Sequence, residues 1–420
     1  MAGLADPAVL SLIALGVVIV VSLTSRINIG VLALALATIV AVVVAKWKPA
    51  DLAAAFPADL FLTLVGVSIL FGAAQANGTL EAVAERVARL GAGNAGLLPI
   101  LFFVFAMVFS AMGPGAISAS ALIAPLAMAT GVRAGASPLL LVLMVANGAN
   151  AGNLSPISAV GLIVSSQMAK AGLTGHEWAS FTANFVAHTL VAIFAFCAFG
   201  GLALLRKGKP EEAAPVLAPF TSRHWFTLAV VAIWILAVIF LSYPPGFSAF
   251  IAAAVLILAR LADDAASLKA TPWAVIIMVA GVGLLMNVLG KTGGMDLFTT
   301  GLSKITTPNI VNGMMAFVTG AISTYSSTSG VVYPAFLPTV TDLTAKLGGG
   351  DPLQIALSIN VGAALVDVSP LSTIGALAIA AVPPGAADTK KLFRSMLIWG
   401  FAMTIVGALF CQLFIRFFAW

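Results

Sequence analysis

The chain has 420 residues, of which 61% are hydrophobic and 8% are charged, and its formal net charge is +5 at pH 7. Soluble domains carry about 25% charged residues, so this composition excludes an ordinary soluble protein. Apolar runs close to the roughly 20 residues that a membrane-crossing helix needs recur along the chain, without strand-like alternation. The sequence therefore predicts an all-α polytopic membrane protein.

Apolar runs and the breaks between them give the predicted elements in chain order. The first half contains spans at 8–24, 29–47 and 58–76, a surface helix at 79–90, a re-entrant hairpin at 96–131, a broken span at 138–168 and a span at 178–205. A basic, proline-containing linker follows at 206–224. The second half contains spans at 226–242, 246–262 and 272–290, a surface helix at 294–305, a hairpin at 309–341, a broken span at 353–382 and a last span at 395–418.

The hairpins and broken spans are apolar stretches interrupted by glycine, proline or hydroxyl clusters. An irregular backbone at membrane depth is tolerated only where it is buried in protein or lines a cavity. The two surface helices are amphipathic, which is typical of helices that lie in the membrane interface.

The order of these breaks occurs twice. Gly66 and Gly281 are 215 positions apart, and so are Gly115 and Gly330. Five spans per half is an odd number, so the second copy must enter the membrane from the opposite side. The sequence therefore predicts two inverted repeats of five transmembrane helices, over 1–205 and 225–420, each with a hairpin and a broken helix.

The distribution of basic residues predicts the orientation. With the N-terminus outside, 13 of the 20 Lys and Arg residues fall on the inner side, as the positive-inside rule requires. We expect both termini outside a bacterial inner membrane. Since topology accounts for the positive charge, no nucleic-acid partner is implied, and the two cysteines give neither a disulfide framework nor metal-ligand spacing.

Inverted repeats with interrupted helices place the transported species near the midplane of the membrane. Neutral hydroxyls, amides and helix N-termini at the hairpin tips and breaks can hold an anion there. The predicted substrate-binding residues are Gly113, Pro114, Gly115, Ser118, Asn153, Ser155, Ser327, Thr328, Ser329, Ser369, Ser372 and Thr373. The same residue types are also ordinary packing residues of membrane helices, which is the alternative for any single one.

A coupling cation is assigned to a second set of polar residues. Asp367 leads this set because an acid far from the end of a span is costly and rarely kept without a role. It either binds a cation or proton, or makes a buried hydrogen bond that orders the broken helix. The full predicted set is Asn147, Asn150, Ser326, Gly330, Asn360 and Asp367, with sodium as the possible metal ion.

Four short motifs then carry a resemblance to a known family: 121–127 (ALIAPLA), 152–156 (GNLSP), 333–338 (YPAFLP) and 368–372 (VSPLS). With the order of hairpins and breaks, the chain resembles the ion transporter superfamily, specifically the divalent anion/sodium symporters and the related MatC-type malonate/dicarboxylate carriers. The resemblance implies a homodimer of scaffold domains whose transport domains move as elevators.

The hairpin tips depart from the pattern of this family. Sodium-coupled members carry Ser-Asn-Thr at each tip, whereas the tips here read Gly113-Pro114-Gly115 and Ser326-Ser327-Thr328-Ser329. The coupling ion, Na⁺ or H⁺, is therefore open.

The expected function is a secondary carrier, rather than an enzyme, for a small dicarboxylate such as succinate, malate or malonate, with no cofactor. Alternatives within the fold are a cation/proton antiporter and a citrate or arsenite permease. An intramembrane protease is disfavoured, because Asp351 in the GxGD-like segment 348–351 precedes Asp367 by sixteen positions on one span. No HExxH motif or nucleophile elbow occurs.

Overall fold

The protein is all-α throughout the part of the chain that the computed structural model describes, which is 6–25, 27–90, 94–207, 218–241, 243–324, 326–382 and 388–420. Several parts of the predictions lie outside these residues. They are residues 1–5 of the first repeat, 208–217 of the linker, Ser242 at the end of the span 226–242, Tyr325 beside the second tip, and Arg26, one of the basic residues counted on the inner side.

The first half begins its helices at polar caps. Asp6, Asn28 and Ser137 each accept a hydrogen bond from the first turn of the helix that follows. The elements are α1 (Pro7–Thr24), α2 (Ile29–Thr38) with its π-helical continuation η2 (Ile39–Val44), α3 (Pro49–Ala54), α4 (Ala58–Ala76), α5 (Thr79–Leu90), α6 (Leu97–Ala111), α7 (Gly115–Arg133), α8 (Pro138–Gly152), α9 (Ala159–Lys170), α10 (Glu177–Ala198) and α11 (Gly201–Lys207).

The second half has the same kinds of element. They are α12 (Ser222–Leu241), α13 (Pro245–Leu258), α14 (Asp264–Ala270), α15 (Trp273–Thr292), α16 (Gly294–Ser303), α17 (Val311–Ser323), η3 (Thr328–Val332), α18 (Tyr333–Phe336), η4 (Leu337–Thr339), α19 (Val340–Leu347), α20 (Pro352–Leu365), α21 (Thr373–Ala380), α22 (Thr389–Phe414) and η5 (Ile415–Phe417).

Six described helices are long and apolar enough to cross a membrane: α4, α7, α10, α12, α15 and α22 with η5. The other predicted spans form shorter apolar helices, some of them in series. The stretch 178–205 is divided between α10 and α11 at Gly200, whose φ is +95°. Such a φ is strained for a residue with a side chain and ends a helix.

The two predicted hairpins differ in construction. The first forms two continuous helices, α6 and α7, and α7 alone has 19 residues, which is long for a re-entrant arm. The second hairpin runs to its tip through α17 and returns through the short segments η3, α18, η4 and α19. It runs to Leu347 rather than ending at 341, because Val340 and Leu343 of α19 are buried and continue the packing.

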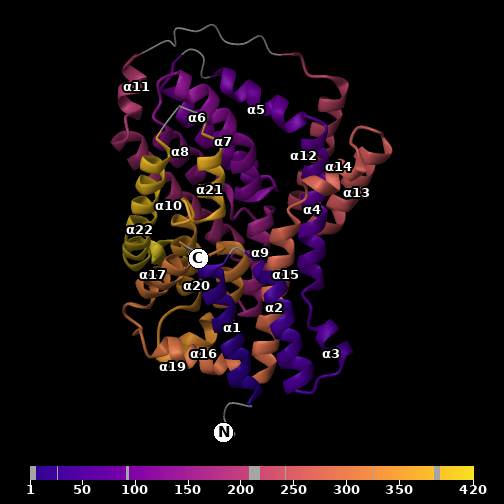
Figure 1. Ribbon diagram of the computed structural model, residues 1–420, viewed down its shortest axis with the longest axis vertical. Helices are drawn as coiled ribbons and strands as arrows, with labels where there is room; N and C mark the ends of the chain where they lie inside the picture. The colour runs from indigo at the N-terminus through magenta and orange to yellow at the C-terminus, as the bar shows by residue number, and fades with distance from the viewer. Residues whose placement is uncertain are drawn as a thin grey trace.

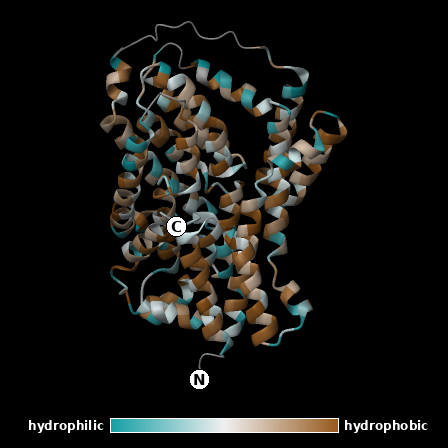
Figure 2. Cartoon of the chain, viewed as in Figure 1, coloured by the Kyte–Doolittle hydropathy of each residue, from teal (hydrophilic) through white to brown (hydrophobic). Residues whose placement is uncertain are grey.

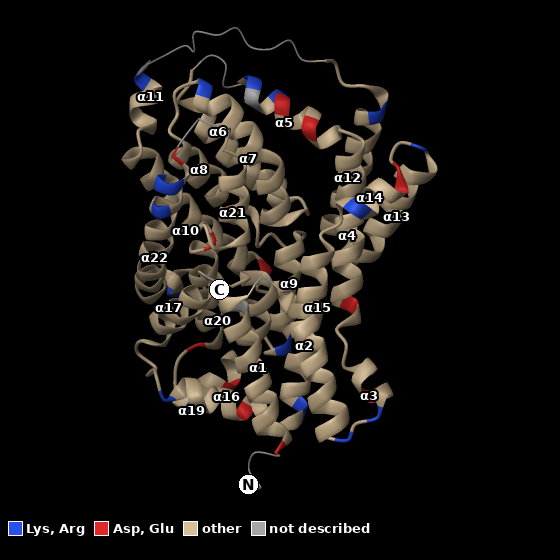
Figure 3. Ribbon diagram, viewed as in Figure 1, with Lys and Arg blue, Asp and Glu red and all other residues tan. Residues whose placement is uncertain are grey.

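The helices form two groups, as Figure 1 shows. α2, α4, α12, α13, α14 and α15 lie on one side, and the hairpins, the broken spans, α10 and α22 lie on the other, with α1 packed on α2 and α15. Apolar residues cover most of the helices along the long axis (Figure 2), while charged side chains gather mainly toward its two ends (Figure 3). This distribution is that of an integral membrane protein.

Matching elements of the two halves lie at opposite ends of the molecule. In Figure 1 the amphipathic helix α5 runs across the top beside α6 and α7, whereas α16 lies at the bottom beside α19. The hairpins accordingly reach toward the middle of the molecule from opposite ends.

Glycines allow two long helices to pack closely against helices of the other half. A Cβ on Gly66 of α4 would lie 2.3 Å from the carbonyl oxygen of Gly246 of α13. A Cβ on Gly281 of α15 would lie 2.2 Å from the carbonyl oxygen of Gly30 of α2. The backbones therefore meet where only hydrogen fits, and each half contributes one helix to each contact.

Candidate binding site

The helical structure is interrupted between α8 and α9 by a turn that serine hydroxyl groups stabilise. The hydroxyl of Ser158 donates to the carbonyl oxygens of Asn153 and Ser155, at 2.5 and 3.0 Å, and accepts from the amide of Gly161. A Cβ on Gly161 would lie 1.9 Å from the carbonyl oxygen of Ser155. Residues 152–158 thus end α8 and cap α9.

The break between α20 and α21 has the same hydrogen bonds. The hydroxyl of Ser372 donates to the carbonyl oxygens of Asp367 and Ser369, at 2.7 and 2.8 Å, and accepts from the amide of Gly375 at 3.2 Å. The two breaks differ in their first residue, which is Asn153 in one half and Asp367 in the other.

Each break holds a hairpin tip. Asn153 accepts a hydrogen bond of 2.8 Å through its side-chain oxygen from the amide of Ala116, at the start of α7. The amide of Ala159 donates to the carbonyl oxygen of Gly113 at 2.8 Å. These bonds fix the first tip against the first break.

The second tip is held by hydroxyls. Ser327 caps η3 by accepting from the amide of Gly330 at 3.1 Å, and Thr328 is hydrogen-bonded to Ser323. The hydroxyls of Thr328 and Ser372 and the phenol of Tyr333 lie near the carboxyl group of Asp367. Asp367 therefore joins its own break to the second tip.

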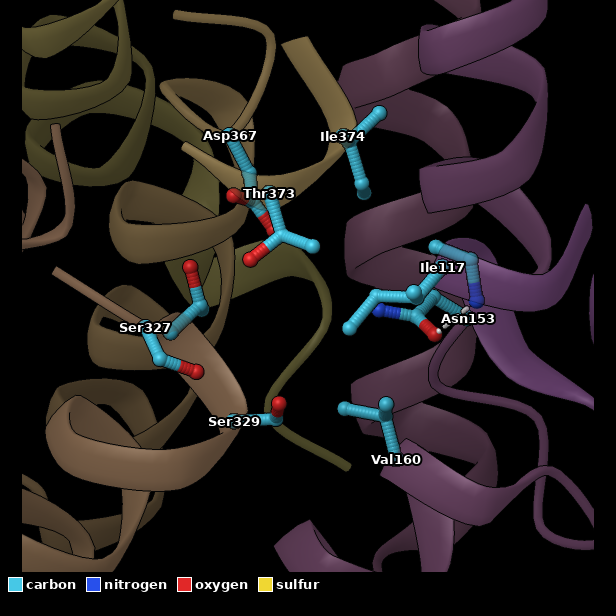
Figure 4. A pocket seen from close by; sticks show the side chains of 10 residues that line it. Ile117, Asn153, Val160, Ser327, Ser329, Asp367, Thr373 and Ile374 are labelled. Atoms are coloured by element: carbon cyan, nitrogen blue, oxygen red, sulfur yellow. Dashed lines mark hydrogen bonds between the residues drawn. The ribbon is translucent and has the colours of Figure 1, made fainter. Parts of the chain in front are cut away.

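The two tips and the two breaks enclose one narrow pocket. In Figure 4 the second-half residues Ser327, Ser329, Asp367 and Thr373 face the first-half residue Asn153 across it. The lining residues are Ala116, Ile117, Asn153, Val160, Ser327, Thr328, Ser329, Asp367, Thr373 and Ile374. They leave room for about one water molecule, so a dicarboxylate would require the tips to move apart.

Four helical segments begin at this pocket: α7 at Gly115, α9 at Ala159, η3 at Thr328 and α21 at Thr373. The first turn of a helix carries amides without partners in that helix and a partial positive charge, both of which favour anions. Among the residues that line the pocket, Asp367 is the one with an ionisable side chain. The site thus combines a field suited to an anion with a single carboxylate.

Apart from Pro114 and Ser118, the predicted residues fall into four groups. Asn153, Ser327, Thr328, Ser329, Asp367 and Thr373 line the pocket. Gly115 starts α7, and Ser155, Ser369 and Ser372 shape the breaks with their hydroxyls. Gly113 and Gly330 lie at the tips, next to Phe71 of α4 and Met278 of α15 respectively, and Ser326 is also in the second tip. Asn147, Asn150 and Asn360 lie instead at the interface of α8, α10 and α20.

Pro114 and Ser118 line a second pocket on the side of the first tip that faces α4, with Phe71 and Gln75 of that helix. They therefore lie beside α4 rather than in the narrow pocket, and their role in substrate binding stays a prediction. The reason is helical geometry, since Ala116 and Ile117 occupy the turn of α7 that faces the break.

Sequence reasoning missed the apolar lining residues Ala116, Ile117, Val160 and Ile374. They carry no polar atom to attract attention. The available signal was position, because each lies one or two residues after the first residue of a helix that starts at a break or tip.

With this geometry established, comparison with known proteins places the chain. Residues 6–153 match the family described as the N-terminus of the dicarboxylate carrier protein MatC. This part of the chain is MatC-like. The resemblance to the MatC-type carriers is therefore confirmed, over a region that includes the first hairpin and ends at Asn153 in the first break.

A solved structure resembles most of the molecule at the level of the fold. The YdaH transporter of Alcanivorax borkumensis, whose crystal structure shows an unusual topology, matches with a TM-score of 0.61 and 18% sequence identity, covering 87% of each chain. At this identity the likeness concerns the fold, which is that of a membrane transporter. No curated protein matches the sequence.

Proposed function

We propose that the protein is a secondary transporter of small dicarboxylates of the succinate, malate and malonate class. The observation that carries this proposal is the convergence of four helical N-termini on one buried pocket between two hairpin tips. Each N-terminus favours negative charge, and the hydroxyls of Thr328, Ser329 and Thr373 can donate to carboxylate oxygens. The match of residues 6–153 to a dicarboxylate carrier family supports the same substrate class.

A cation must accompany the substrate. A dianion beside the Asp367 carboxylate would place like charges a few ångströms apart in surroundings of low dielectric constant, where their repulsion is strong. Binding Na⁺ or H⁺ at Asp367, beside the second tip that contains Ser326 and Gly330, would offset this repulsion. It would also lower the cost of moving the loaded site through the membrane.

An inverted repeat and an elevator movement fit this arrangement. The two breaks contain the same serine hydrogen bonds. Each of the two close glycine contacts joins one helix of the first half to one helix of the second half. The hairpins and broken spans form one helix group, whose tips rest on α4 and α15 of the other. In the proposed movement the first group slides along the second and carries the site across the membrane.

The proposed assembly is a homodimer with both termini outside. Only 17% of the apolar membrane-spanning stretch of α12 is buried. Its large apolar side chains therefore face outward, toward lipid or a second copy of the chain. The helices α5 and α11 and the start of α12 lie at the end opposite the N-terminus (Figures 1 and 3). They carry Arg86, Arg89, Arg206 and Arg223, which fits an inner side rich in basic residues.

A cation/proton antiporter is the second candidate. The small size of the pocket favours it, because a site with room for about one water molecule and a single carboxylate suits a small cation. An antiporter would bind and exchange cations at Asp367 without any carboxylate ligand.

A thermal-stability screen of the purified protein distinguishes the two candidates. Ligands that bind the folded state raise its Tm. We expect dicarboxylates to raise Tm more than mono- or tricarboxylates, and to drive counterflow in proteoliposomes. Absence of any carboxylate effect in both assays, combined with cation exchange, would establish the antiporter instead.

A further inference from the structure

A second polar cluster is buried away from the pocket, where α8, α10 and α20 meet. Ser180, Asn184 and His188 lie one turn apart along one face of α10, and all three are fully or almost fully buried. They face Asn147 and Asn150 of α8 and Asn360 of α20. This residue group, called the asparagine cluster below, does not line the narrow pocket.

Hydrogen bonds fix the direction of most of its amide groups. Asn147 donates through Nδ2 to the carbonyl oxygen of Leu143 at 2.8 Å, and Asn184 donates through Nδ2 to that of Asn150 at 2.6 Å. A backbone carbonyl only accepts, so each of these side chains must turn its NH₂ group toward the backbone and its oxygen elsewhere.

The same reasoning applies to the histidine and to the third helix. Because Asn147 presents its oxygen to His188 Nδ1 at 2.9 Å, Nδ1 carries the hydrogen and Nε2 of the neutral ring carries a lone pair. Asn360 donates through Nδ2 to Ser180, whose own hydroxyl donates to the sulfur of Met168.

This leaves the cluster with an excess of acceptors. Four acceptors have no hydrogen-bond partner among the described residues, namely the side-chain oxygens of Asn150, Asn184 and Asn360 and Nε2 of His188, against one unpartnered donor group, Nδ2 of Asn150. A buried polar atom without a partner destabilises the folded state, so a group of such lone pairs favours a ligand that carries positive charge.

The surroundings select the class of cation. α8 and α20 contain no ionisable side chain, and α10 contributes only the imidazole of His188 to the cluster. Divalent cations prefer carboxylates, and no group of three His, Cys, Asp or Glu side chains that could hold a metal ion occurs among the described residues. Asn150 also lies in the last turn of α8, where the partial negative charge of a helix C-terminus favours a cation.

We propose that the asparagine cluster is a binding site for one monovalent cation of the size of Na⁺, held by neutral amide oxygens. α8 and α20 are the helices that lead into the two breaks, so occupation of this site would stiffen the backbone on which both breaks are built. The phenol of Tyr333, which donates to the carbonyl oxygen of Asn360 at 2.9 Å, links it to the surroundings of Asp367.

The experiment measures Tm of the full-length protein while NaCl replaces choline chloride at constant ionic strength, without any carboxylate. We expect a saturable rise in Tm with Na⁺. Because no substrate is present, the result does not depend on the proposed transport function. Asp367→Asn should keep a saturable rise, since this site is separate from Asp367.

Asn150→Leu is the decisive variant, because the amide atoms of Asn150 have no protein partner to lose. Introduced into the Asp367→Asn variant, Asn150→Leu should abolish the remaining rise of Tm with Na⁺. Asn184→Leu in the same background should have the same effect. Thr189→Val, on another face of α10, is the matched control and should keep the rise. An unchanged response in both asparagine variants, or no specific effect of Na⁺ on the wild-type protein, would overturn the proposal and leave internal water as the ligand.

Discussion

At the residue scale, the two halves of the site differ most at one position. Asn153 and Asp367 occupy equivalent places in the breaks, yet the first is neutral and bonds an amide, whereas the second is an acid that faces hydroxyls. A carboxylate beside an anionic substrate repels it and weakens binding, unless the carboxylate binds a cation that offsets its charge.

Asp367→Asn should therefore fold normally but lose uptake driven by an ion gradient, because the amide keeps the shape of the carboxylate without its charge. Uptake into proteoliposomes, measured separately under a sodium gradient and a proton gradient, checks this. Concentrative uptake by the variant under either gradient would assign coupling to another residue.

Asn153→Ala should weaken dicarboxylate binding. It removes the acceptor for the amide of Ala116 and frees the first tip. It also removes Nδ2, which we expect to donate to a substrate carboxylate. A hydrogen bond to a charged group contributes about 1.5–3 kcal/mol, so an apparent affinity loss of about tenfold or more is expected. Lys48→Ala, at an exposed residue, is the control and should leave the affinity unchanged; equal affinities in both variants would place the site elsewhere.

At the scale of elements, the paired helix contacts depend on glycine. The backbone of α4 touches that of α13, and the backbone of α15 touches that of α2, each at one residue. Packing of this kind is typical of membrane helices, which lack a hydrophobic driving force toward each other and gain from close approach.

Gly66→Ala and Gly281→Ala should each destabilise the fold by about 1–3 kcal/mol, since the added methyl group would meet a backbone oxygen that cannot rotate away. Gly16→Ala is the matched control, because nothing lies within 4 Å of a Cβ at that helical position. Lower Tm in the first two variants, with the control unchanged, is the expected result. Equal Tm in all three would show that the helices are further apart than described.

At the scale of the whole molecule, transport by an elevator requires the first hairpin tip to leave α4. Gln75 of α4 and Ser118 of α7 line the same pocket beside that tip. A link between them should hold the two helix groups together.

We expect a bifunctional thiol reagent to stop transport by a Gln75→Cys/Ser118→Cys variant in which Cys197 and Cys411 are replaced by serine. Each single cysteine variant, treated in the same way, should remain active. Transport that continues after complete cross-linking would contradict movement at this interface.

The sequence alone determined the membrane class, the all-α fold, the positions of most helices and the MatC-type resemblance. Composition and the length of apolar runs carry this information directly, because every membrane-crossing helix must be apolar and about as long as the hydrocarbon core is thick. The sequence also predicted both breaks, because clusters of serine, glycine and proline interrupt a helix and serine caps the helix that follows.

Only the tertiary structure decided which of these polar residues share a site. The predicted cation set separates, with Asp367 in the pocket and Asn147, Asn150 and Asn360 in a cluster between other helices. Pro114 and Ser118 face α4, while the apolar Ile117 and Val160 face the pocket. The reason is that the direction of a side chain depends on how a helix is rotated against its neighbours, and in helices that are apolar on all sides the sequence carries no periodic signal of that rotation.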